Sequence, residues 1–194
     1  MEQIRTFIAI ELEEPIRDGL ARVQEQLKRG DATRVVRWVR PGGIHLTLKF
    51  LGNVPAQRIE EIGQALERAC VGFAPFTLTF GGLGCFPSTS RPRVVWVGVQ
   101  DESGTLARLQ EAVEREVAPL GFPTEKRGFS PHLTLGRVKR ASTGERRRLG
   151  ELIRGTEIGS LGQMRVRAVS LMRSDLKPSG AVYTQLRSVA LEGP

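Results

Sequence analysis

The same tetrapeptide, His-Leu-Thr-Leu, occurs twice in this chain, at residues 45–48 and at residues 132–135. The two copies lie 87 positions apart and contain the only two histidines among the 194 residues. Successive side chains of a β-strand point to opposite faces, so each copy places its histidine and threonine on one face and its two leucines on the other. The repeat therefore predicts two equivalent strands, each anchored by leucines in a core, whose polar faces meet across a shared cleft.

Hydrophobic periodicity predicts a mixed α+β chain around these two strands. The Pro-Gly-Gly turn at residues 41–43 predicts that a strand at 44–51 returns antiparallel to a strand at 34–39. The whole order, without strict β-α-β alternation, favours largely antiparallel sheets, and residues 1–194 are expected to form a single domain because no linker interrupts them. Strands are expected at residues 4–12, 34–39, 44–51, 76–80, 93–99, 132–138, 164–172 and 181–190, helices at 15–30, 55–69, 106–117 and 140–154, and loops at 84–92 and 173–180.

Composition favours a polyanionic partner. Lys and Arg number 29 against 21 Asp and Glu, a net charge of +8 at pH 7. This balance favours nucleic acid first, although a generally arginine-rich proteome would give the same excess. Cys70 and Cys85 follow no metal-binding spacing, the apolar run near the N-terminus is too short for a signal peptide, and no apolar stretch approaches the roughly 20 residues of a membrane span. The expectation is a cytoplasmic protein without a membrane partner, and a monomer by default.

Two imidazoles and two hydroxyls around one small volume suit phosphoryl chemistry. A neutral imidazole can accept a proton from an attacking water, and a protonated imidazole can give one to the leaving oxygen. The hydroxyls of Thr47 and Thr134 can donate to the phosphate oxygens, where charge must be held in the transition state. A single His-x-Thr in a strand is usually structural, but a doubled one that uses every histidine favours function. No metal is expected, because two histidines without an Asp, Glu or Cys at ligand spacing make a poor zinc site.

The stretches around both histidines resemble the paired HxTx motifs of the 2H phosphoesterase superfamily. The first reads HLTLKFLG from His45 and the second FSPHLTLGR from Phe129 to Arg137. Within that superfamily the chain is similar to the RNA 2′,3′-cyclic phosphodiesterases, also called 2′-5′ RNA ligases, over essentially its whole length. Supporting stretches are RTFIAI from Arg5, Arg40-Pro41, RPRVVWVGV from Arg91, and Tyr183.

The resemblance implies a bilobal fold of two mostly antiparallel sheets with pseudo-two-fold symmetry, helices on the outer faces and an HxTx strand from each lobe in a central cleft. It implies metal-independent hydrolysis of a 2′,3′-cyclic phosphate end on RNA to a 2′-phosphate, with 2′-5′ ligation as a further activity and no cofactor. His45 would be the proton donor to the leaving 3′ oxygen and His132 the proton acceptor that activates water. Thr47 and Thr134 would hold the phosphate, and Arg137 would bind substrate beside it.

Strict alternation places Arg137 on the face opposite His132. A bulge or strand end at Gly136 would return Arg137 to the cleft, and we adopt this hypothesis. Phe50, the equivalent position in the first copy, is expected to be a core residue. Flanking cations such as Arg40 and Arg93 are candidates for an RNA track, and Trp38, Phe7 and Phe86 are candidates for stacking a base.

Two alternatives remain open at this point. The first keeps the site and changes the substrate to a free cyclic nucleotide, ADP-ribose cyclic phosphate or a 2′-5′ oligonucleotide. The second is a non-catalytic module that binds RNA ends and whose histidines only contact phosphate. Substitution of His45 or His132 by alanine separates catalysis from binding alone.

Overall fold

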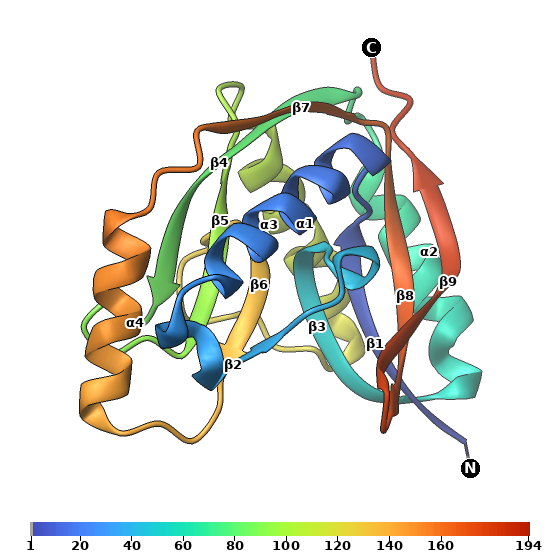
Figure 1. Cartoon of the computed structure of the whole chain (residues 1–194). Coiled ribbons are helices and arrows are strands. Elements are labelled where there is room, and N and C mark those ends of the chain that lie inside the picture. The colour runs from blue at the N-terminus through green and yellow to red at the C-terminus, as the bar shows by residue number, and fades with distance from the viewer. Residues whose placement is uncertain (1) are drawn as a thin grey trace.

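The structure, a computed structural model, describes residues 2–194 and shows two antiparallel sheets with four helices (Figure 1). One sheet has the order β3-β1-β8-β9 and the other the order β2-β6-β5-β4-β7. The expected α+β class is confirmed. The strands are β1 (Gln3–Ile10), β2 (Val36–Trp38), β3 (Leu46–Pro55), β4 (Phe76–Phe86), β5 (Val94–Gln100), β6 (His132–Val138), β7 (Ser160–Val166), β8 (Ala168–Lys177) and β9 (Gly180–Ala190), and the helices are α1 (Glu14–Lys28), α2 (Ile59–Cys70), α3 (Thr105–Val117) and α4 (Thr143–Gly155).

The two copies of the motif lie in different sheets. The first copy has His45 just before β3 and its other three residues at the start of that strand, an edge strand of the four-stranded sheet, whereas the second copy begins β6 in the five-stranded sheet. Alternation holds in both, because the leucines at 46, 48, 133 and 135 are buried while the intervening threonines are only half-buried. All four leucines belong to one hydrophobic cluster that takes residues from both sheets.

The helices follow the expected apolar stripes. In α1 the side chains of Ile16, Leu20, Val23 and Leu27 are buried, as their spacing predicts. Helix α1 crosses the front of the view in Figure 1 and contacts β7, while α2 and α3 pack against each other. Helix α4 begins at Thr143 rather than at 140, because Ser142 and Glu145 form a reciprocal capping box at that point.

The expected hairpin between residues 34–39 and 44–51 is wrong. Strand β2 pairs with β6, and β3 pairs with β1. Residues Pro41–Gly43 form a short 3₁₀ turn that carries the chain from one sheet to the other. The pairing of β3 with β1 runs over eight residue pairs, whereas β2 has only three residues to offer.

Three further expectations about strands and loops are wrong. The stretch 164–172 divides between β7 and β8, which lie in different sheets, and the expected loop 173–180 is mostly the arms of the β8–β9 hairpin. Strand β4 also continues through Gly81 and Gly82 to Phe86, because Gly82, with φ 76°, lets the strand bulge instead of ending.

Candidate active site

A cavity of about 690 Å³ takes side chains from both motifs. His45 lines it from the position just before β3, Thr47 from β3, and Thr134 and Arg137 from β6. His132 is not part of this wall, but it lies on β6 two residues before Thr134, with the buried Leu133 between them. The structure thus brings four of the five expected site residues to one cavity and places the fifth, His132, on the strand that carries Thr134 and Arg137.

The main chain orients both imidazoles in the same way. The Nδ1 atom of His45 lies 2.9 Å from the carbonyl oxygen of Gly43, and the Nδ1 atom of His132 lies 2.8 Å from the carbonyl oxygen of Ser130. A carbonyl oxygen can only accept a hydrogen bond, so Nδ1 carries the hydrogen in each ring. Each Nε2 is therefore the atom that can exchange a proton with a substrate: it accepts in the neutral ring and donates in the protonated ring.

Aromatic rings pack edge-on against each histidine. His45 contacts Phe7 and Tyr183 with ring centroids 5.6 and 4.9 Å away, and His132 contacts Phe86 at 4.7 Å. Phe7 is itself only 4% exposed. These contacts fix the ring planes and remove water from one side of each imidazole. Phe7 and Phe86, which were candidates for stacking a base, lie edge-on against the histidines.

The surroundings of the two histidines differ in charge. Burial lowers the pKa of both from its usual value; the hydrogen bond to Gly43 or Ser130 opposes this shift. The carboxylate of Glu11 also raises the pKa of His45, although Arg17 lowers it, while Arg137 further lowers the pKa of His132. A nearby anion therefore favours a protonated His45, and a nearby cation favours a neutral His132.

Glu11 is held in place by side chains of the same sheet. Its Oε2 atom accepts hydrogen bonds from the hydroxyl of Ser170 on β8, at 3.1 Å, and from the amide of Gln185 on β9. Gln185 also donates to the Ser170 hydroxyl at 3.0 Å. Glu11 carries no motif signal and was not predicted as a site residue; its effect on His45 comes from pairing strands that are distant in sequence.

Matched irregularities interrupt the two motif strands. Ala9 of β1 pairs with Thr47 of β3 and the preceding Ile8 pairs with Lys49, so Leu48 is an extra residue without a partner on β1. Pairing of β5 with β6 passes from Trp96–Thr134 to Val95–Gly136, so Leu135 is an extra residue. These bulges occur at equivalent positions, and each shifts the alternation of side chains after it by one residue.

The bulges decide which side chains reach the cavity. After Leu135 the alternation places Gly136 on the buried side and Arg137 in the cavity wall. After Leu48 it places Lys49 on the buried side and Phe50 in the same wall, with Phe50 59% exposed. The expectation that Phe50 belongs to the core is therefore wrong. Its equivalence to Arg137 was the signal that could have identified it.

The wall of the cavity offers further polar and apolar groups. Arg5, Asn53 and Ser174 line it, and Leu176, which is 69% exposed, adds apolar surface. Among residues 2–194 the buried Thr6 hydroxyl in this wall has no hydrogen-bond partner. These residues can supply hydrogen bonds, a cation and apolar contacts to a substrate larger than a phosphate group.

Metal ligands and thiols are the other groups among residues 2–194 that could carry chemistry. No cluster of three or more His, Cys, Asp or Glu side chains suited to a metal ion occurs there. Cys70 and Cys85 are free, and burial raises the pKa of both thiols to about 11, so neither is a thiolate nucleophile near neutral pH. Across residues 2–194 no helix is long and apolar enough to cross a membrane.

Comparison with known proteins gives one consistent family. The family model described as LigT like Phosphoesterase matches residues 10–96 and again residues 97–183, one motif in each match. The RNA 2′,3′-cyclic phosphodiesterase of Methanothermobacter thermautotrophicus is 39% identical over 184 residues, which cover 95% of this chain and 97% of that protein. The protein of the same name from Aquifex aeolicus is 30% identical over 194 residues, covering 100% of both chains.

Solved structures agree with the sequence comparison. The crystal structure of the Thermus thermophilus protein TT0787 superposes with a TM-score of 0.77 at 30% identity, covering 98% of this chain and 99% of that one. The structure of E. coli LigT complexed with 3′-AMP superposes with a TM-score of 0.76 at 27% identity and the same coverage.

Proposed function

The chain belongs to the LigT-like phosphoesterase family, and we propose that it hydrolyses 2′,3′-cyclic phosphate ends of RNA to 2′-phosphates with two histidines and no metal. The observation that carries this proposal is the matched orientation of the two imidazoles. Each Nδ1 is engaged by a main-chain carbonyl, each Nε2 is the exchangeable site, and each histidine precedes a cleft threonine by two residues. The names of the relatives support the choice of substrate.

The reaction uses one imidazole in each protonation state. Nε2 of His132 takes a proton from water as the water oxygen attacks phosphorus. The bond from phosphorus to the 3′ oxygen breaks, and Nε2 of the protonated His45 gives its proton to that oxygen. The product carries a 2′-phosphate and a 3′-hydroxyl, and the two histidines have exchanged protonation states.

The remaining groups stabilise charge and hold the substrate. The hydroxyls of Thr47 and Thr134 donate to the non-bridging oxygens, and the guanidinium of Arg137 balances their charge. The charge environment supports the direction of proton transfer, because Glu11 favours the acid form of His45 and Arg137 favours the base form of His132. The exposed ring of Phe50 offers a platform for the terminal base.

We also propose that the same side chains can catalyse 2′-5′ ligation. A 5′-hydroxyl in place of water, activated by His132, would form a 2′-5′ linkage by the same steps. We place the enzyme as a monomer in the cytoplasm, and the two free cysteines agree with a reducing compartment. Hydrolysis of small cyclic nucleotides or 2′-5′ oligonucleotides is the second candidate, since such substrates would present their phosphate to the same histidines and threonines.

The test compares an oligoribonucleotide that ends in a 2′,3′-cyclic phosphate with the free cyclic mononucleotide, both in EDTA. The proposal predicts a higher kcat/KM for the oligonucleotide and a 2′-phosphate product by ³¹P NMR. A 3′-phosphate product would contradict the assignment of the leaving oxygen. Equal kcat/KM values for both substrates would favour the second candidate, and loss of turnover in EDTA would contradict a metal-free mechanism.

A further inference from the structure

Two buried glutamines contact the bulges of the two motif strands. Gln24 on α1 is 2% exposed, and its Nε2 atom donates to the carbonyl oxygens of Leu135, at 3.0 Å, and Val39, at 2.7 Å. Gln110 on α3 is 7% exposed, and its Nε2 atom donates to the carbonyl oxygen of Leu48 at 3.4 Å. Each glutamine therefore reaches the carbonyl of the extra residue in a motif strand.

The two contacts are crossed between the repeated halves. Gln24 belongs to the first match of the family model and supports the motif strand of the second, while Gln110 belongs to the second match and supports the motif strand of the first. Buried amides of this kind are costly unless hydrogen-bonded, and both amide hydrogens of Gln24 have an acceptor. The repetition of the contact in both halves indicates a function beyond filling space.

The bulge at Leu135 is what allows Thr134 and Arg137 to face the same cavity. In a regular strand, positions i and i+3 point to opposite faces. One extra residue between them returns the second side chain to the first face. A one-residue slip would move Gly136 toward the cavity and Arg137 into the position that Gly136 occupies. That position has no room, because a Cβ atom there would lie 2.5 Å from Val36 Cγ1.

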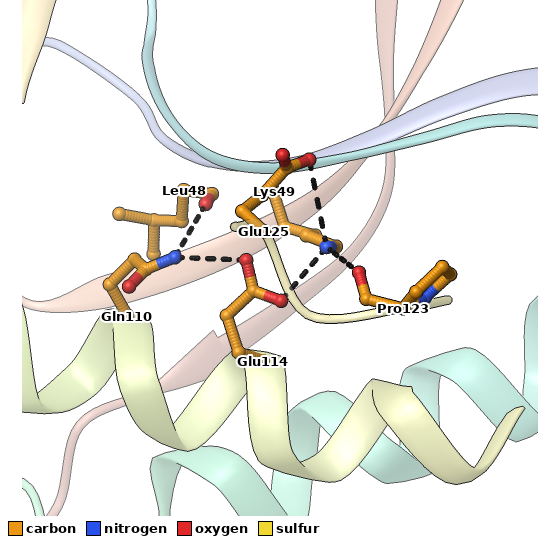
Figure 2. Close-up of polar contacts among 6 residues, drawn as sticks. All are labelled: Leu48, Lys49, Gln110, Glu114, Pro123 and Glu125. Atoms are coloured by element: carbon orange, nitrogen blue, oxygen red, sulfur yellow. Dashed lines mark hydrogen bonds and ion pairs between the residues drawn. The ribbon is translucent and has the colours of Figure 1, made fainter. Parts of the chain in front are cut away.

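More side-chain hydrogen bonds surround the bulge in the first copy of the motif than the one in the second. In the first copy Gln110 also donates to Glu114 at 3.1 Å, and Glu114 accepts from the ammonium of Lys49 at 2.8 Å (Figure 2). Lys49 donates in turn to the carbonyl of Pro123, on the segment that leads toward His132. The second copy has a glycine where Lys49 stands, so the hydrogen bonds of Gln24 are its counterpart to this network.

We propose that Gln24 and Gln110 are positioning residues, each of which holds the bulge of the opposite motif strand in register. Gln24 thereby keeps Arg137 directed at the cavity. This inference rests on the proposed function, since it takes Arg137 to act on the substrate.

The test is a double-mutant cycle between Gln24 and Arg137, with kcat/KM on the cyclic-phosphate oligonucleotide as the readout. Gln24→Met keeps the volume and removes the donor. We expect it to lower kcat/KM by about 10- to 100-fold in the parental chain, the range for a misplaced catalytic group. In the Arg137→Met background the same substitution should lower it by less than about twofold, because its effect passes through Arg137.

Gln110→Met is the matched control. It removes the equivalent donor in the other half and should lower kcat/KM by the same factor in the parental chain and in the Arg137→Met background. A similar factor for Gln24→Met in both backgrounds, or no effect in the parental chain, would overturn the inference while leaving the proposed function intact. An Arg137→Met variant as active as the parent would remove the proposed role of Arg137 and this inference with it.

Gln24→Glu keeps the test decisive if the methionine variant does not fold. A neutral carboxyl can donate to one of the two carbonyls, and an ionised one cannot. Its activity relative to the parent should fall as pH rises and the carboxyl ionises, and this fall should be absent in the Arg137→Met background. A Gln24→Glu variant with parental activity at every pH would contradict the inference.

Discussion

Replacement of Lys49 by methionine should cost about 3–5 kcal/mol of unfolding free energy, as does removal of one partner from other buried ion pairs. The side chains of Lys49 and Glu114 are only 3% and 6% exposed and their charged atoms lie 2.8 Å apart. Without the ammonium, the Glu114 carboxylate stays buried with the amide of Gln110 as its remaining donor in Figure 2. For a chain of this size, that loss corresponds to a fall in Tm of about 6–20 °C.

The double variant Lys49→Met/Glu114→Met measures the coupling between the two charged side chains. It removes the buried charge together with its partner, so it should be much more stable than either single variant, with a coupling free energy of at least about 2 kcal/mol. Urea unfolding followed by circular dichroism measures all four proteins. The exposed pair Lys28–Glu25 is the control, since Lys28→Met should cost less than about 1 kcal/mol.

Two results would refute this account of Lys49. One is a loss below about 1 kcal/mol in the single variant, which would mean that the pair is screened like a surface pair. The other is a double variant as unstable as the sum of the singles, which would mean that the two side chains stabilise the fold independently.

Three further outcomes follow from the site. Because burial lowers the pKa of both histidines, kcat/KM should follow a bell-shaped pH profile with its maximum below about pH 6.5. Since Glu11 raises the pKa of His45, Glu11→Gln should move the alkaline limb of this profile to lower pH, and an unmoved limb would contradict the role of Glu11. The unfolded chain binds more protons than the native one between the lowered pKa values and about 6.5, so the unfolding free energy should rise with pH through this window; a slope that persists in a His45→Gln/His132→Gln variant would refute its assignment to the histidines. Phe50→Ala should raise KM for the oligonucleotide by about 5- to 100-fold, while Phe50→Trp should keep it near the parental value; an unchanged KM in the alanine variant would exclude stacking.

Local pattern was sufficient to predict the elements that carry the motifs. The alternation of leucine with histidine and threonine identified both motif strands and their buried faces, since it depends only on the two-residue period. The stripe from Ile16 to Leu27 identified α1 for the same kind of reason. The repetition of the motif predicted a cleft shared by two halves, and family resemblance then supplied the reaction and the roles of the residues in it.

Strand pairing and side-chain contacts between segments that are distant in sequence could not be predicted from local pattern. Residues 34–39 and 44–51 are joined by a turn that suits a hairpin, yet each pairs with a strand far away in sequence. Pairing also creates the bulges at Leu48 and Leu135, and the first of these decides that Phe50 reaches the cavity. Gln24 shows the same limit, because its position on α1 is visible in the sequence while its acceptor at residue 135 is not.

The central claim is that two histidines exchange protons with one substrate, and the pH dependence of kcat/KM for His45→Gln and His132→Gln tests it most directly. With the cyclic-phosphate oligonucleotide in EDTA, each variant should lose at least about 100-fold in kcat/KM. His132→Gln should abolish the acid limb of the profile and His45→Gln the alkaline limb. A variant that keeps the parental rate, or one that keeps both limbs, would contradict the two-histidine mechanism.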